Sequence, residues 1–161
     1  MLLRLIVKGF KNLENVDIRF GPFTCIAGQN GAGKSNIFDA IQFLSDLASM
    51  PLNDAAQRVR NPHGRPVDIR DLFTKRADGK FQNMSFSVDI AVPHEVEDEL
   101  GLRVMPAATF LNYTLIFSYV APVGRSRSGL RLEYEHLQYI PSSTASKEIL
   151  FANEKDRKSV V

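Results

Sequence analysis

Residues 28–35 have the types and the spacing that bind the phosphates of a nucleotide. They read Gly-Gln-Asn-Gly-Ala-Gly-Lys-Ser and fit G-x-x-x-x-G-K-[ST] at every fixed position. Glycine permits positive φ angles and lets the backbone approach a ligand closely, so successive amides can form a concave nest for an anion. The pattern predicts that the nest uses the amides of Asn30, Gly31, Ala32, Gly33, Lys34 and Ser35.

Two side chains of this segment are candidates for direct chemistry. Lys34 carries a mobile positive charge that can reach the β- and γ-phosphates and neutralise charge during phosphoryl transfer, so it is the catalytic candidate. Ser35 carries a hydroxyl that can ligate Mg²⁺. The expected ligand is ATP with Mg²⁺, seated on residues 28–36, which brings Asn36 into the predicted site.

A strand before the loop and a helix after it must position these groups. Residues 23–27 form a short apolar run bounded by glycine, which predicts a strand buried on both faces. The period then changes, and the apolar residues recur at helical spacings at Ile37, Ile41, Leu44 and Ala48. We therefore expect an amphipathic helix that ends before Pro51, with Asp39 and Asp46 on its other faces.

Most of the remaining chain alternates with the period of two that is typical of half-buried strands. Such strands are expected in five segments, at residues 2–7, 16–20, 84–90, 111–119 and 130–134. The connections are expected to include helical turns at residues 52–60 and 68–73, a surface loop or short helix at 93–101, and a hairpin turn at 124–129. We predict a single lobe over residues 1–161, in which residues 1–50 hold the first strands, the loop and its helix, residues 84–140 form an antiparallel meander, and residues 153–161 are a polar tail.

Composition limits the other classes of site. The chain has 161 residues, 44% of them hydrophobic, and a formal net charge of +2, which does not demand a nucleic-acid or membrane partner. Cys25 is the single cysteine, which excludes an internal disulfide and favours a reducing compartment, the cytoplasm. The three histidines share no metal-ligand spacing. No apolar run is long enough to span a bilayer, so no membrane partner is expected.

The N-terminal third resembles a known family. Residues 28–41 read Gly-Gln-Asn-Gly-Ala-Gly-Lys-Ser-Asn-Ile-Phe-Asp-Ala-Ile, and residues 5–13 read Leu-Ile-Val-Lys-Gly-Phe-Lys-Asn-Leu. Both segments resemble the ABC-type ATPase heads of SMC and RecF proteins and of related ATPases, including the overcoming-lysogenisation ATPases of phage defence. The resemblance implies an α/β fold: the N-terminal half of a P-loop NTPase of the ABC-type head, with an antiparallel β-meander lobe.

The resemblance also implies residue roles. A basic residue after the first strand of these heads packs by the nucleotide, and the matching position here is Lys11. A glutamine after the meander senses Mg²⁺ and the γ-phosphate, and Gln138 lies in the matching region. The heads also need an apolar strand ending in Asp-Glu and a serine-glycine-rich signature. We find neither, so the catalytic base is expected from sequence outside these residues.

The same resemblance implies partners and an activity. The expected partners are a second ATPase head, in a homodimer or larger assembly, and an accessory nuclease. The expected activity is an action on DNA in repair or phage defence. Residues 58–80 are a candidate surface for DNA phosphates, and the alternative is a solvated face of the domain. The segment contains Arg58, Arg60, Arg65, Arg70, Lys75, Arg76 and Lys80, opposed by Asp68, Asp71 and Asp78. A second basic cluster comprises Arg125, Arg127 and Arg131.

The alternative to an ATPase is an interaction module that binds ATP without hydrolysing it and gates a partner or nuclease. A small-molecule kinase shares the loop, but the antiparallel meander argues against that class.

Overall fold

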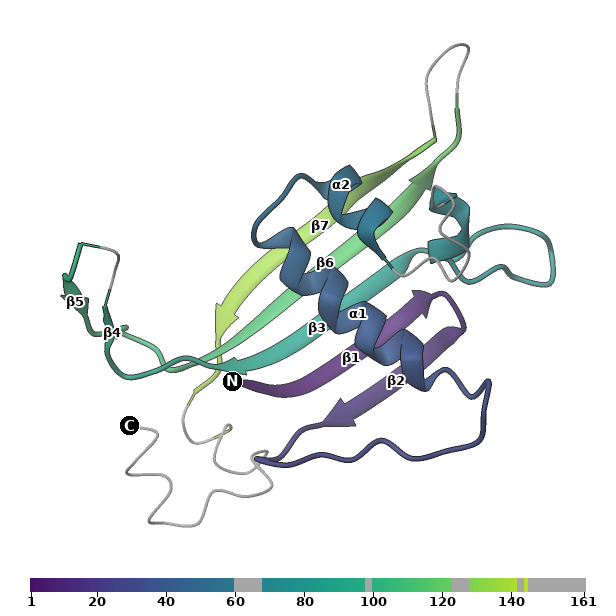
Figure 1. Cartoon of the computed structure of the whole chain (residues 1–161). Coiled ribbons are helices and arrows are strands. Elements are labelled where there is room, and N and C mark those ends of the chain that lie inside the picture. The colour runs from purple at the N-terminus through teal and green to yellow at the C-terminus, as the bar shows by residue number, and fades with distance from the viewer. Residues whose placement is uncertain (60–67, 98–99, 123–127, 142–143, 145–161) are drawn as a thin grey trace.

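The computed structural model describes residues 1–59, 68–97, 100–122, 128–141 and 144 of the chain. Five strands form one antiparallel sheet in the order β2-β1-β3-β6-β7. Their bounds are β1 Leu2–Phe10, β2 Leu13–Arg19, β3 Met84–Ala91, β6 Phe110–Val120 and β7 Gly129–Tyr139. Helices α1 (Lys34–Leu47) and α2 (Leu52–Arg58) lie across one face of this sheet (Figure 1). The expected mixed α/β class with an antiparallel meander is confirmed.

Three short elements complete the described fold. The 3₁₀ turn η1 (Ile69–Leu72) follows α2 in chain order and matches the helical turn expected at residues 68–73. Strands β4 (Val96–Glu97) and β5 (Arg103–Val104) pair with each other in a small hairpin that projects from the end of the large sheet (Figure 1). The loop or helix predicted for residues 93–101 is therefore wrong in part, because Val96 and Glu97 find strand partners across the hairpin.

The alternation of the strands produces a continuous apolar row under the helices. Val7 of β1 pairs with Phe86 of β3, and Phe86 pairs with Leu115 of β6, so the three side chains share the covered face of the sheet. All three are buried. The strands predicted from period-two alternation at residues 2–7, 84–90 and 111–119 are thus confirmed.

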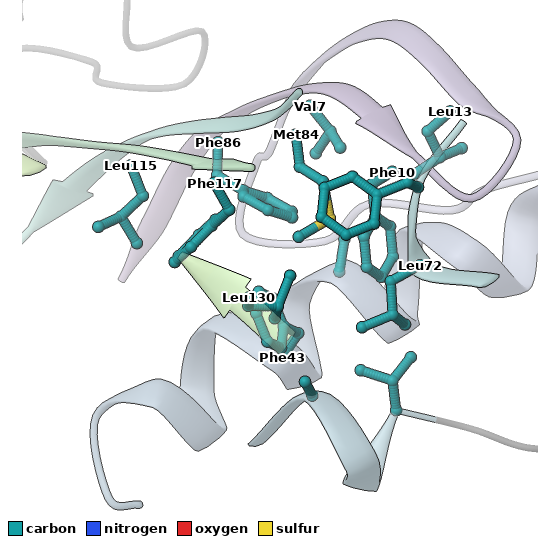
Figure 2. Close-up of a cluster of buried hydrophobic side chains, with 14 of the residues drawn as sticks. Val7, Phe10, Leu13, Phe43, Leu72, Met84, Phe86, Leu115, Phe117 and Leu130 are labelled. Carbon is teal, nitrogen blue, oxygen red and sulfur yellow. The ribbon is translucent and has the colours of Figure 1, made fainter. Parts of the chain in front are cut away.

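Four phenylalanines connect the sheet to α1 at the centre of the core. Phe43 of α1 packs against Phe86 and Phe117 with ring centroids 5.7 and 5.8 Å apart, and Phe10 lies 5.5 Å from Phe86 (Figure 2). Offset and edge-on ring pairs at these separations each add about 0.5–1.5 kcal/mol beyond the area they bury. This cluster fixes α1, and with it the loop that precedes α1, against the sheet.

The buried stripe of α1 differs from the stripe expected from sequence. Ala40 and Phe43 are fully buried whereas Ala48 is exposed. Asp39 and Asp46, expected on other faces, are 8% and 5% exposed. The prediction was wrong because each carboxylate lies near a cation from another element, and a buried charge is tolerated when it is paired. Lys11 is 2.8 Å from Asp39 and Arg58 is 3.6 Å from Asp46, although Asp46 Oδ2 has no hydrogen-bond partner among the described residues.

The strand predicted at residues 23–27 is also wrong. These residues form no strand, the side chain of Phe23 is 87% exposed, and Cys25 is exposed. A strand needs a neighbouring strand to satisfy its backbone groups. Residues 23–27 pair with neither of the two edge strands of the large sheet, β2 and β7. Residues 124–127 and 153–161, predicted as a turn and a polar tail, lie outside the described residues.

Candidate phosphate-binding site

The predicted phosphate-binding segment leads directly into α1. Gly31 and Gly33 have φ angles of 83° and 88°, in the left-handed region that favours glycine, and Gly33 is the N-cap of the helix. The amide of Asn36 donates a hydrogen bond to the Gly33 carbonyl at 2.9 Å, which starts the first helical turn. The two positive φ angles therefore turn the chain sharply at the start of α1.

The first amides of α1 are available to an anion. In the described part of the chain, no backbone carbonyl accepts a hydrogen bond from the amides of Gly33, Lys34 or Ser35. These are the unsatisfied N–H groups of a helix N-terminus, and the helix dipole adds partial positive charge there. The Ala32 amide donates instead to the Gln29 carbonyl at 3.3 Å, so in this conformation it is engaged within the loop.

Lys34 and Ser35 are the first two residues of α1. The Lys34 ammonium folds back over the loop and donates to the carbonyls of Gly28 and Gln29, at 2.5 and 2.6 Å. Ser35 is exposed, and its hydroxyl has no partner among the described residues, so it is free to bind a metal ion. It borders a cavity of about 380 Å³ whose other lining residues are Phe38, Asp39, Gln42, Arg58 and Val59.

Lys11 occupies the tight turn between β1 and β2, beside α1. It is the one described non-glycine residue with positive φ, at 50°, and its ammonium forms an ion pair with Asp39 at 2.8 Å. Its side chain is 16% exposed. The structure thus brings Lys11 to the first turns of α1, where its ammonium is paired with Asp39. The sequence had predicted Asp39 on a face of α1 away from the apolar stripe.

Gln138 is not brought to the loop. It lies on the outer strand β7, opposite Asn112, in a row that continues through Asp89 to Arg4. The loop lies beyond the other end of β1, at Phe10. At standard strand spacings the two places are separated by about 20 Å along β1 and about 14 Å across the sheet. In this arrangement Gln138 and Ser35 do not form a common metal site.

Two neighbours of the predicted site were not found from sequence. Asn12 accepts a hydrogen bond from the side chain of Asn36 at 2.7 Å, and Asp39 holds Lys11. The available signal was the spacing of Asn36 and Asp39, three residues apart and therefore neighbours on one helix face. No local pattern indicated that a turn 24 residues away along the chain would lie against that face.

The basic segment is partly neutralised. Arg70 pairs with Asp68, and this guanidinium holds the pKa of the Asp68 carboxyl below its ordinary value. Arg58 lies 3.6 Å from Asp46. Lys75 and Arg76 are exposed, and among the described residues neither has a carboxylate partner. Lys80, also predicted here, is exposed. Arg60, Arg65, Arg125 and Arg127 lie outside the described residues, whereas Arg131 is exposed and 3.9 Å from Glu133.

This segment adjoins the turn that carries Lys11. A cavity of about 520 Å³ is shared by the turn and the basic segment, and it is lined by Lys11, Asn12, Asp68, Arg70, Asp71, Phe73, Lys75 and Phe81. In the described residues no group of three or more histidine, cysteine or acidic side chains is arranged to hold a metal. No helix in the described part is both long and apolar enough to cross a membrane.

Comparison with known proteins places the similarity at the N-terminus. Residues 1–59 match the family model described as "RecF/RecN/SMC N terminal domain". The DNA replication and repair protein RecF of Bacteroides thetaiotaomicron is 40% identical over 80 residues, which are 49% of this chain and 21% of that protein. The OLD nuclease of Thermus scotoductus is 52% identical over 44 residues, 27% of this chain and 8% of that protein.

The chain spans a minor part of these relatives. It covers 17–21% of the RecF proteins from Phocaeicola vulgatus and Bacteroides species that it matches. One solved structure, described as "Structural biochemistry of ATP-driven dimerization and DNA stimulated activation of SMC ATPases", is 19% identical with a TM-score of 0.46, covering 98% of this chain and 95% of that one.

Proposed function

Because residues 1–59 form an N-terminal region of the SMC/RecF type of ABC ATPase, we propose that this chain binds ATP with Mg²⁺ on residues 28–36. The observation that carries the proposal is the joined geometry of Gly33, Lys34 and Ser35. A left-handed glycine opens α1, and among the described residues the amides of Gly33, Lys34 and Ser35 have no backbone carbonyl partner. The Lys34 ammonium and the Ser35 hydroxyl flank these amides. Each of these groups matches a charge or an oxygen of a metal-bound triphosphate.

Each residue has a distinct part in this proposal. The amides of Gly33 to Ser35 would hold the phosphate oxygens, and Lys34 would leave its two loop carbonyls to pair with the β- and γ-phosphates. Ser35 would hold Mg²⁺ through its hydroxyl. When bound, the metal would supply positive charge that neutralises the phosphates. Lys34 would add to that neutralisation while water attacks the γ-phosphorus in line and ADP leaves.

The wider activity is proposed to be that of an SMC/RecF-like ATPase that couples ATP binding to an action on DNA, in repair or a related process. A second head and DNA are the proposed partners. A nuclease is proposed as well, because the OLD nuclease of Thermus scotoductus is 52% identical to 44 residues of this chain. Phage defence is one process in which such an assembly would serve.

A second candidate is a module that binds ATP without hydrolysing it. One observation favours it: in the described strands, no apolar run ends in Asp-Glu, and Asp89 of β3 is engaged by the side chain of Asn112 at 2.6 Å. The residue that would orient the attacking water is therefore not among those described.

Calorimetry with MgATP and a phosphate-release assay separate these possibilities. The full-length protein should bind MgATP, and failure to bind would refute the proposed function. Steady-state phosphate release by the full-length protein supports the ATPase, whereas binding without release supports the module. A polypeptide limited to the 161 residues is expected to show negligible turnover, and turnover equal to that of the intact protein would mean that a catalytic carboxylate lies within this chain.

A further inference from the structure

We propose that Asn12 is a positioning residue for the phosphate-binding loop. Its side chain fixes Gly33 and Asn36, and thereby holds the first turn of α1 in the conformation that receives phosphate. The inference rests on the proposed function, since it assigns a role to a residue outside the loop in the binding that the loop performs.

The turn that carries Asn12 is itself firmly anchored. The Lys11 amide donates to the Leu72 carbonyl at 2.9 Å, and the Thr74 hydroxyl donates to the Lys11 carbonyl at 2.7 Å. The Lys11 ammonium pairs with Asp39, whose side chain is 10% exposed. These bonds hold the turn between the η1 region on one side and α1 on the other. A residue at this turn is therefore attached to the core rather than to a free loop.

Asn12 contacts the loop at two places. Its Oδ1 accepts a hydrogen bond from Asn36 Nδ2 at 2.7 Å. Its amide also covers Gly33 so closely that a Cβ built on Gly33 would lie 2.7 Å from Oδ1 and 3.0 Å from Nδ2. Gly33 is thus required both for its φ of 88° and for the approach of Asn12.

These contacts bear directly on the anion-binding amides. Gly33 and Asn36 bracket Lys34 and Ser35, whose amides have no backbone carbonyl partner among the described residues. Holding both ends of this four-residue span removes conformational freedom that the loop would otherwise lose when phosphate binds. Asn12 thus raises phosphate affinity without touching phosphate, because the ordering is done in advance.

The test is a double-mutant cycle on MgATP affinity in the full-length protein. We expect Asn12→Ala and Asn36→Ala each to weaken binding about 2- to 12-fold, the range set by one hydrogen bond. The double variant should bind about as well as either single variant, because each substitution removes the same contact. Asn15→Ala, at an exposed asparagine of the same hairpin, should leave the affinity unchanged.

Asn12→Asp provides the rescue arm, because it keeps the oxygen that accepts from Asn36. The added loss caused by Asn36→Ala should persist in the Asn12→Asp background and vanish in the Asn12→Ala background. Thermal unfolding midpoints should differ little among the variants, since the bond is exposed.

The outcomes separate the two proposals. If the wild type binds MgATP but the losses from the single variants multiply in the double variant, Asn12 has no positioning role and the proposed function stands. If affinity falls only in proportion to a lowered unfolding midpoint, the role is structural and the inference is overturned. If the wild type itself does not bind MgATP, both proposals are refuted.

Discussion

The Lys34 ammonium donates a hydrogen bond to the Gly28 carbonyl at 2.5 Å, and this bond closes the phosphate-binding loop on itself. A second bond, to the Gln29 carbonyl at 2.6 Å, holds the ammonium over the same turn. The single basic side chain of residues 28–35 is therefore held by the loop's own carbonyls, next to the first amides of α1.

Replacing this charge should abolish most of the nucleotide affinity. Lys34→Ala is expected to weaken MgATP binding about 10- to 150-fold, the range for a hydrogen bond to a charged group. Calorimetry on the full-length protein measures the change. Lys8→Ala is the matched control, because Lys8 is an exposed lysine on β1. An affinity that survives the Lys34 substitution unchanged would falsify the assignment of the loop.

Ser35 should determine the metal dependence of binding rather than binding as such. Its exposed hydroxyl is free to ligate Mg²⁺, so Ser35→Ala should remove most of the gain in ATP affinity that Mg²⁺ provides while leaving affinity in EDTA nearly unchanged. Titrations with and without Mg²⁺ measure both quantities. Equal losses under the two conditions would contradict a role as metal ligand.

The two left-handed glycines of the loop should differ in their tolerance of alanine. A Cβ on Gly31 meets nothing within 4 Å, so Gly31→Ala should cost only the backbone strain of about 1–2 kcal/mol. Gly33→Ala should cost more, because its Cβ also collides with the Asn12 amide at 2.7 Å. Urea unfolding gives both values. Adding Asn12→Ala should recover part of the Gly33 loss, and no recovery would mean that the collision is relieved elsewhere.

Tyr113 should give the protein an alkaline dependence of stability. Burial, assisted by a hydrogen bond to Glu135 and by the charge of that carboxylate, raises the pKa of Tyr113 to about 12 from its ordinary 10.0. The folded state therefore holds this proton more tightly than the unfolded state. The resulting stabilisation is complete below pH 10 and is lost as the pH rises from 10 to 12. Unfolding free energies across this window should converge for wild type and Tyr113→Phe, and a pH-independent difference would oppose the assignment.

The basic segment should contact DNA mainly through its unpaired charges. Lys75→Ala combined with Arg76→Ala should reduce the slope of log affinity against log salt by about 1.8, at about 0.9 for each phosphate contact. Arg70→Ala should change the slope less, because Arg70 is paired with Asp68. Titration of duplex DNA at several salt concentrations decides this. If the double variant keeps the parent slope, this segment is not the DNA surface.

Much of the fold was accessible from sequence because its signals are local. The period-two alternation around Phe86 and Leu115 predicted strands, and the change of period after Ser35 predicted α1. The strand prediction for residues 23–27 was wrong because it also relied on a local signal. An apolar run indicates that a segment can be buried, but it does not indicate whether a neighbouring strand is present to pair with it.

The sequence by itself was enough to predict a phosphate-binding loop, because the positions of its glycines, Lys34 and Ser35 depend on backbone geometry within eight consecutive residues. Only the tertiary structure decided what lies against that loop. It brought Asn12 to Gly33 and Lys11 to Asp39, and it left Gln138 at the far edge of the sheet. The physical reason is that strand register and the rotation of α1 are set by the packing of the whole phenylalanine core, which no local pattern encodes.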